Sequence, residues 1–218
     1  EGKRAQPRLK PPFPAVEGLY ASPTVINNVE TLACVPHIVM RGSRWFREIG
    51  PDKSPGPKLY CVSGQVLKTG LYELPMGLPL RELVESHAGG PLPGRRIKAV
   101  IPGGVSAPVI PESGLDVGMD FDSLAAAGSM LGSGGVIVID DAQNLVKQIA
   151  RAARFFAHES CAQCTQCREG TAWTTKILER IVAGDGTHED LDTLLEIGEN
   201  MTGKTICVLS DSCATPVA

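Results

Sequence analysis

The sequence has no apolar run of about 18 residues, so we expect no segment of it to insert into a membrane. It has no basic excess either: 24 acidic residues against 21 Lys and Arg give a net charge of −3. This balance argues against nucleic acid as the main partner, because phosphate binding needs a positive field. The first residues also lack the apolar segment of a signal peptide. Seven cysteines without such a signal predict a reducing compartment, where free thiols serve metals.

The familiar nucleotide-binding loops are missing as well. The glycine-rich stretch 132–135 has neither the G-x-G-x-x-G spacing nor the lysine of a P-loop. A strand pattern follows it, where a phosphate loop would need a helix. We interpret the stretch as a turn.

Three cysteines stand together in one short stretch. Cys161, Cys164 and Cys167 lie at i, i+3 and i+6, so one tight loop can direct their thiols at three irons of an iron–sulfur cluster. A fourth ligand must come from elsewhere, and Cys207 and Cys213 are the candidates. Zinc is the alternative, but zinc sites usually combine two separated cysteine pairs, whereas this pattern is three plus one.

The pattern before residue 142 predicts an extended arm, a helix and a small sheet. Prolines keep 1–20 extended, and a helix over 29–40 follows, with Asn27 or Asn28 as its cap and Cys34 in its apolar pattern. A helix begins near Pro79 and stops at the glycines 89–90. Expected strands cover 58–64, with Cys61 packed inside it, then 70–75, 97–102 and 135–140, and 107–111 offers a short edge piece. This order is compatible with a β-grasp sheet that holds one helix.

The remaining sequence predicts three helices, over 144–158, 170–183 and 188–201. Trp173 is expected on the buried side of the second helix, and Leu191 and Leu195 inside the third. Thr187 with Asp190 forms the capping box of the third helix. We expect no further helix before Ala218, and we interpret His158 as a residue that caps or supports the metal site rather than a ligand.

Three ordered motifs carry a family resemblance. The stretches 8–14 (Arg-Leu-Lys-Pro-Pro-Phe-Pro), 24–32 (Thr-Val-Ile-Asn-Asn-Val-Glu-Thr-Leu) and 159–171 (Glu-Ser-Cys-Ala-Gln-Cys-Thr-Gln-Cys-Arg-Glu-Gly-Thr) resemble the NADH-binding flavoprotein subunit, of the 51 kDa type, of respiratory complex I (NADH:quinone oxidoreductase). Relatives of this subunit serve NAD-linked hydrogenases and formate dehydrogenases. The resemblance runs over essentially the whole chain.

The resemblance implies an α+β protein in three parts. Residues 1–48 would be the C-terminal end of an FMN-binding α/β domain with a linker, 49–141 a soluble-ligand-binding β-grasp domain, and 142–218 a truncated helical bundle that holds a 4Fe–4S cluster. The family's glycine-rich loop for FMN and NADH would lie upstream of Glu1. We therefore expect a part of a longer chain, and we expect these 218 residues alone to be inactive as an NADH dehydrogenase.

The resemblance also implies site residues. The cluster ligands would be Cys161, Cys164, Cys167 and Cys207, the last through the match to Gly-Lys-Thr-Ile-Cys at 203–207. FMN contacts would be Asn27, Asn28 and Thr31, and no catalytic side chain is implied. The family's loop more often has Gly and Pro where this chain has Ala162 and Gln166. Arg168, directly after the third ligand, either raises the cluster potential or forms a surface ion pair.

The implied function is electron transfer. NADH would reduce FMN in the full-length protein, and electrons would pass singly to the 4Fe–4S cluster and on to quinone through partner subunits. The implied partners are other peripheral-arm subunits of complex I, above all the smaller 2Fe–2S subunit and the larger iron–sulfur subunit. The implied location is the cytoplasmic face of the inner membrane, or the matrix side in a eukaryote. The alternatives are a hydrogenase or formate dehydrogenase flavoprotein subunit, a zinc-stabilised interaction module, and a ligand-binding protein that acts through its sheet.

Overall fold

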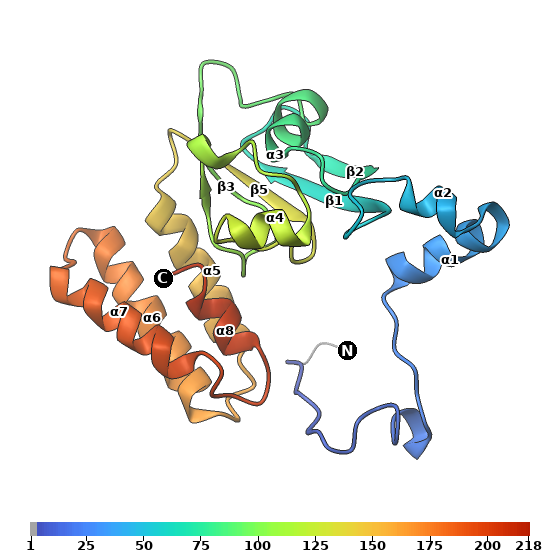
Figure 1. Ribbon diagram of the computed structural model, residues 1–218. Coiled ribbons are helices and arrows are strands. Elements are labelled where there is room, and N and C mark those ends of the chain that lie inside the picture. Colours follow the sequence, from blue (N-terminus) through green and yellow to red (C-terminus); the bar gives the residue numbers. More distant parts are fainter. Residues whose placement is uncertain (1–3) are drawn as a thin grey trace.

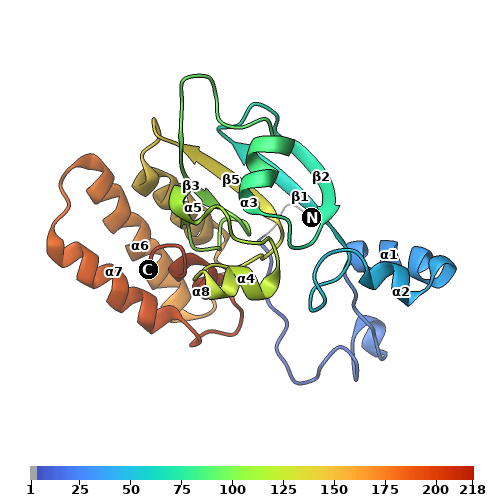
Figure 2. The same ribbon diagram turned by 45° about the horizontal axis from the view of Figure 1, so that its top comes forward.

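The computed structural model describes residues 4–218 (Figure 1). The arm runs without regular structure to residue 28, apart from the 3-10 turn η1 (Leu19–Ala21), and leads into α1 (Val29–Arg41) and α2 (Ser43–Arg47). Figures 1 and 2 show these two helices at one end of the molecule, the sheet between, and the last four helices at the other end. Within the described residues, no helix is long and apolar enough to cross a membrane.

One open five-stranded sheet forms the middle of the molecule. Its strands are β1 (Pro57–Gly64), β2 (Gly70–Pro75), β3 (Ile97–Ile101), β4 (Ile110–Pro111) and β5 (Gly135–Asp140), in the spatial order β2-β1-β5-β3-β4. The strand β1 pairs antiparallel with β2 and parallel with β5, whereas β3 runs antiparallel to both β4 and β5. The strands expected from the sequence are confirmed. The expected turn lies at 132–134, with Gly132 and Gly134 at φ +48° and +73°, and Gly135 already begins β5.

Helical elements cover one face of this sheet. They are α3 (Leu80–Glu82), which continues as the π-helical turn η2 (Leu83–His87), and α4 (Phe121–Ala126) with the preceding 3-10 turn η3 (Glu112–Gly114). Apolar side chains of α3 and η2 pack on the strands; the shared core includes Tyr60, Val62, Leu80, Leu83, Val84, Val100 and Val138. A helix that covers one sheet face was expected, and it is there.

The other face of the sheet packs against a helical bundle. The bundle consists of α5 (Leu145–Glu159), α6 (Thr165–Ala183), α7 (His188–Met201) and α8 (Leu209–Ala214). One core joins them to the sheet; it includes Ile101, Ile139, Ile149, Phe156, Ile177, Leu194 and Cys213. The expected capping box is confirmed, with Thr187 and Asp190 bonded reciprocally. The helix α6 ends at Gly184, which takes the left-handed conformation typical of helix ends.

Several expectations from the sequence are wrong. The helix α6 begins at Thr165 rather than at 170, and α8 was not expected, because its six residues are too short for a periodic pattern. Cys61 is exposed rather than packed, and Cys34 is only half-buried. Trp173 is 51% exposed, and the other misplaced apolar side chains, Leu191, Leu195 and the α1 residues Val29, Leu32 and Val35, are exposed as well. Periodicity identifies an apolar stripe, but it does not say whether another element covers that stripe.

Candidate metal centre

The end of α5 and the start of α6 build the three-cysteine loop. The chain leaves α5 at Ser160, turns at Ala162 with φ +64°, and enters α6 directly after Cys164. Cys161 and Cys164 therefore lie on the turn, whereas Cys167 stands in the first turn of α6 and is buried. A positive φ is strained for alanine, because its Cβ approaches the backbone. The residue in this strained conformation is the spacer at which the resembled family more often has glycine.

A second segment brings Cys207 to this loop. After α7 the chain turns at Gly203, with φ +70°, and runs back over 204–208 before α8 begins. The backbone N–H of Ile206 points at the Cys164 sulfur, with an N to Sγ distance of 3.5 Å. Thr205 Oγ1 donates to the Cys207 carbonyl at 2.8 Å, which fixes the local turn. Residues that are about 40 positions apart in sequence therefore meet.

The four thiols line one cavity of about 410 Å³. Residues of the arm cover part of it, and its wall is Ala5, Gln6, Pro7, Phe155, Phe156, Glu159, Ser160, Cys161, Gln163, Cys164, Cys167, Thr205, Cys207 and Leu209. Cys213 is absent from this lining and fully buried in the helical core. Burial raises the pKa of Cys213 to about 12, so its thiol stays protonated.

Cys167 is the most constrained of the four thiols. Burial raises its pKa most, the Ser160 hydroxyl opposes that rise, and the nearby Cys207, Cys161 and Cys164 add to it. The Ser160 Oγ to Cys167 Sγ distance is 3.4 Å. Several thiolates that crowd together repel one another, so a bound cation that neutralises them would release protons on binding. Ser160 was not singled out in the sequence; its place directly before Cys161 is the signal that could have identified it.

The donor set fits an iron–sulfur cluster. Four soft sulfurs are the ligands of a cubane, and the cavity gives them a space to surround. Zinc would need four thiolates within about 2.3 Å of a single ion. In the part of the chain that the structure describes, no three or more His, Cys, Asp or Glu side chains converge on one such position.

The polar neighbours of the loop, Arg168 and His158, bind groups other than the cysteine sulfurs. Arg168 Nε pairs with Glu169 at 2.8 Å, and its Nη1 donates to the Ala162 carbonyl at 2.9 Å. Arg168 therefore forms the ion pair that was one of its two expected roles, and it also holds the cysteine turn. His158 is exposed, pairs with Glu159 at 2.9 Å, and does not line the cavity.

The expected flavin residues lie at the start of α1. Asn28 Oδ1 accepts from the Glu30 N–H at 2.8 Å, so Asn28 is the cap that the sequence predicted. Asn27 and Thr31 are exposed next to it. Ile26, just before them, and Cys207 line the same hollow of about 830 Å³, which is also lined by Arg8 and Lys10 of the arm. The expected flavin segment and the thiol cavity are thus separated by one hollow.

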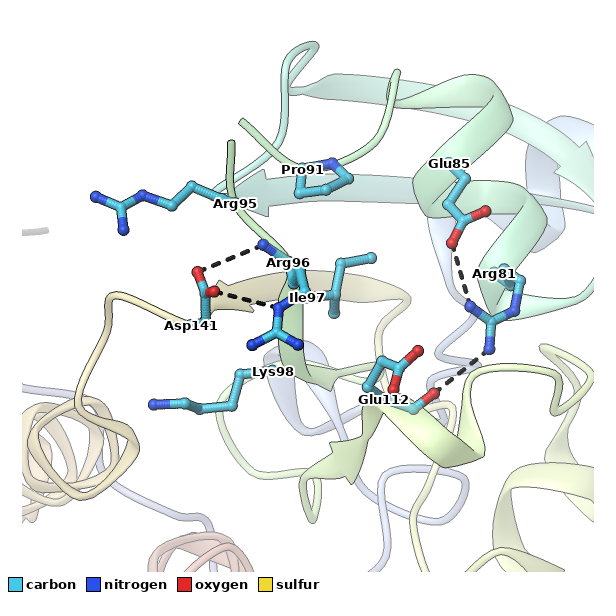
Figure 3. Close-up of a pocket in the computed structure, with 9 residues that line it drawn as sticks. All are labelled: Arg81, Glu85, Pro91, Arg95, Arg96, Ile97, Lys98, Glu112 and Asp141. Carbon is cyan, nitrogen blue, oxygen red and sulfur yellow. Dashed lines mark hydrogen bonds and ion pairs between the residues drawn. The ribbon is translucent and has the colours of Figure 1, made fainter. Parts of the chain in front are cut away.

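A third hollow lies on the sheet, far from the thiols in sequence. This arginine pocket of about 530 Å³ is lined by Arg81, Glu85, Pro91, Arg95, Arg96, Ile97, Lys98, Glu112 and Asp141 (Figure 3). Arg81 pairs with Asp116 at 2.7 Å and with Glu85 at 3.2 Å, and Lys98 donates to the Gln143 carbonyl at 2.6 Å. Figure 3 shows Asp141 facing Arg96, whereas the Arg95 guanidinium points away from the other labelled side chains.

The chain is similar to known proteins over its whole length. Residues 147–218 match the iron–sulfur binding region of the NADH-ubiquinone oxidoreductase-F family, and residues 59–110 match the SLBB domain. The chain is 73% identical over 214 residues to the NADH-quinone oxidoreductase F 2 subunit of Rhizobium meliloti, covering 98% of this chain and 51% of that protein. It is 51% identical over 217 residues to the NADH-quinone oxidoreductase F subunit of Mycobacterium tuberculosis, covering 100% of this chain and 48% of that protein.

A solved structure is similar too. The NAD+-reducing [NiFe]-hydrogenase in its air-oxidized state superimposes with a TM-score of 0.86 at 40% identity, over 97% of this chain and 36% of that chain. The chain thus spans about half the length of the curated relatives it matches.

Proposed function

Because this chain belongs to the family of NADH-quinone oxidoreductase F subunits, we propose that it forms the electron-accepting part of an NADH dehydrogenase subunit. The single observation that carries this proposal is the cavity shared by Cys161, Cys164, Cys167 and Cys207. All four thiols lie within the matched iron–sulfur binding region.

The four thiolates would hold a 4Fe–4S cluster. The Ile206 N–H and the Ser160 hydroxyl already approach two of the sulfurs and would donate to them, which raises the reduction potential of a bound cluster. The apolar wall formed by the buried Phe156 and the half-buried Leu209 would limit access of water. Arg168 would keep the turn in shape through the Ala162 carbonyl rather than bind sulfur.

We place the flavin contact at Asn27, Asn28 and Thr31. Amide and hydroxyl groups at the start of a helix suit a polar ligand, and Ile26 connects this segment to Cys207 through one hollow. When bound, FMN supplies hydride acceptance from NADH and a 4Fe–4S cluster supplies single-electron uptake. The chain's own part is to hold the two groups on either side of that hollow.

The finer assignments follow from the same family. We propose that 1–48 belongs to the FMN-binding part, 49–141 is a β-grasp domain and 142–218 is the cluster-binding bundle, and that these residues alone do not oxidise NADH. In the whole protein, quinone would be the final acceptor, reached through the smaller 2Fe–2S subunit and the larger iron–sulfur subunit of the peripheral arm. The assembly would stand on the cytoplasmic or matrix side of its membrane.

A second candidate is the flavoprotein subunit of an NAD-linked hydrogenase. The structural similarity to an NAD+-reducing [NiFe]-hydrogenase favours it, and the same thiols would serve. The quinone-linked relatives are more similar in sequence, at 51–73% against 40% identity, and this favours the quinone-linked function.

Iron and acid-labile sulfide in the anaerobically purified full-length subunit test the proposal. We expect about four of each per chain, the content of one 4Fe–4S cluster, and a brown colour. One zinc per chain with no sulfide would instead support a zinc-stabilised module and contradict electron transfer.

A further inference from the structure

Glu30 stands between the two asparagines of the flavin segment and the sheet, and neither the sequence motifs nor the proposed function gives it a role. Its carboxylate accepts two hydrogen bonds from β1: Lys58 Nζ donates to Oε2 at 2.9 Å, and the Leu59 N–H donates to Oε1 at 2.7 Å. In turn, the Glu30 N–H donates to Asn28 Oδ1 at 2.8 Å. An unbroken chain of hydrogen bonds therefore connects Asn28 to the sheet.

The strand end at Leu59 is a rigid point of attachment. The ladder between β1 and β5 begins only at Cys61, whose N–H donates to the Gly134 carbonyl at 3.0 Å. Successive N–H groups on one side of a strand are two residues apart, so the Leu59 N–H points past the end of β5. The Glu30 carboxylate supplies the acceptor that β5 does not. The next residue, Tyr60, is fully buried and donates through its hydroxyl to the Met119 carbonyl at 3.1 Å.

The other end of this connection has little else to hold it. The helix α1 contains no buried residue, and its apolar side chains Val29, Leu32 and Val39 are exposed. By contrast, the Lys58 and Glu30 side chains are only 14% and 28% exposed, and in the part of the chain that the structure describes no other ion pair has both members below 30%. Burial raises the pKa of Glu30, but the hydrogen bonds from Lys58 and the Leu59 N–H outweigh it and lower that pKa, so the carboxylate is charged at neutral pH.

We infer that Glu30 is a positioning residue, which fixes the flavin segment at Asn27 and Asn28 to the end of β1. The inference rests on the proposed function, because it takes that segment as the flavin contact. Glu30 does not need to touch the flavin. It fixes the position of the start of α1 relative to the sheet, and thereby the position of the Asn27 and Asn28 side-chain amides. Its effect on flavin binding must then be shared by Lys58, which lies on the sheet.

The test measures FMN affinity of the FMN-depleted full-length subunit by quenching of flavin fluorescence. Glu30→Ala is expected to weaken FMN binding about tenfold, the size of one lost charged hydrogen bond. Glu30→Gln keeps an oxygen for the Leu59 N–H and loses the ion pair, so it should fall between Glu30→Ala and the wild type. Lys58→Met should reduce FMN affinity as much as Glu30→Gln does. The double variant Glu30→Ala with Lys58→Met should bind FMN no more weakly than Glu30→Ala alone, because both substitutions act through one contact.

Glu48→Gln is the matched control. Glu48 pairs with Arg44 on the exposed side of α2, so its loss should leave FMN affinity within about twofold of the wild type. Iron content should be unchanged in every variant, and hydrogen exchange should rise in the peptide 24–33 of the Glu30 variants before FMN is added. If Glu30→Ala does not fold, Glu30→Gln and Lys58→Met decide the question by the same measurement.

Two outcomes overturn the inference and are distinguishable from failure of the proposed function. If Asn27→Ala loses FMN affinity while the Glu30 and Lys58 variants stay within about twofold of the wild type, Glu30 is only a structural contact. If Glu30→Ala weakens FMN binding without raising hydrogen exchange in the peptide 24–33, Glu30 acts on the flavin directly rather than by position. If Asn27→Ala leaves FMN affinity unchanged, the flavin assignment itself fails, and the inference fails with it.

Discussion

The thiol cavity and the arginine pocket are hollows of similar size, about 410 and 530 Å³, but they differ in what their polar groups already do. In the arginine pocket the charges are largely committed to one another: Arg81 has Asp116 and Glu85, and Arg96 has Asp141. In the thiol cavity, the sulfurs have only two hydrogen-bond contacts within residues 4–218, at 3.4 and 3.5 Å, from Ser160 and from the Ile206 N–H. These are weak partners for sulfur, so the thiols keep their capacity for a metal.

The difference shows that the capacity of a hollow to bind a ligand depends on polar groups that lack strong partners rather than on its volume. A ligand that entered the arginine pocket would have to break existing ion pairs before it made new contacts. An iron–sulfur cluster in the thiol cavity would displace protons and almost nothing else. Substitutions should therefore have their largest effects in the thiol cavity and their smallest in the arginine pocket.

The largest effect is expected from the cavity thiols. Replacing Cys161, Cys164, Cys167 or Cys207 singly with Ser should lower iron from about four atoms per chain to a small fraction of that, because a hydroxyl is a poor ligand for iron in a cubane. Cys213→Ala should keep its iron, since Cys213 is buried outside the cavity lining. Iron and acid-labile sulfide per chain, measured under anaerobic conditions, are the readout.

The control differs from the test variants in its position and in the residue that replaces cysteine. If Cys213→Ala loses iron and Cys207→Ser keeps it, the fourth ligand has been assigned wrongly. Alanine is chosen over serine for Cys213 because a buried hydroxyl without a partner costs about 1–3 kcal/mol, which could unfold the bundle for reasons unrelated to the metal.

A smaller effect is expected at Ala162, which carries the left-handed turn of the cavity loop at φ +64°. Ala162→Gly should raise the thermal midpoint, with a net gain of about 1 kcal/mol or less, because the relief of strain exceeds the extra entropy that glycine has in the unfolded chain. Ala157→Gly, inside α5, is the matched control and should lower the midpoint, by about 1 kcal/mol. Equal destabilisation in both variants would mean that Ala162 is not strained.

Local patterns in the sequence predicted much of the fold. The alternation and turn residues around 58–75 and the apolar run 135–140 identified strands, because the residue pattern within a strand indicates which of its faces are buried. Thr187 and Asp190 identified a helix start for the same reason: both partners of the capping box lie within four residues. The spacing of Cys161, Cys164 and Cys167 pointed to one site, and the cavity contains all three.

What the sequence did not reveal depends on distant residues. Nothing local to Trp173 says that no other described element covers it, and nothing local to Glu30 says that the Leu59 N–H, 29 positions away, lies within reach of its carboxylate. Spacing alone also left the choice between Cys207 and Cys213 open, and only the family resemblance at 203–207 favoured Cys207. In the fold, Cys207 lines the cavity and Cys213 lies in the helical core. The start of α6 was misplaced because Gln166 and Arg168 give no apolar period to mark its first turn.

The smallest effects are expected in the arginine pocket. Arg95→Met should change stability by less than about 0.5 kcal/mol and leave iron unchanged, since the Arg95 side chain makes no hydrogen bond or ion pair with any residue in 4–218.

Arg81→Met should lower the thermal midpoint at pH 7, because Asp116 and Glu85 lose their shared cation. The hydrogen bond from Arg81 holds the pKa of Asp116 below its usual range, so this stabilisation exists above the unfolded pKa of about 4 and disappears as the pH falls through the folded pKa. The difference between wild type and Arg81→Met should therefore shrink below about pH 4 and shrink at high salt. Differential scanning fluorimetry across pH, with and without phosphate, provides the measurement. A phosphate-dependent rise of the midpoint that Arg95→Met abolishes would show a free cation that binds anions, and would remove the contrast between the two hollows.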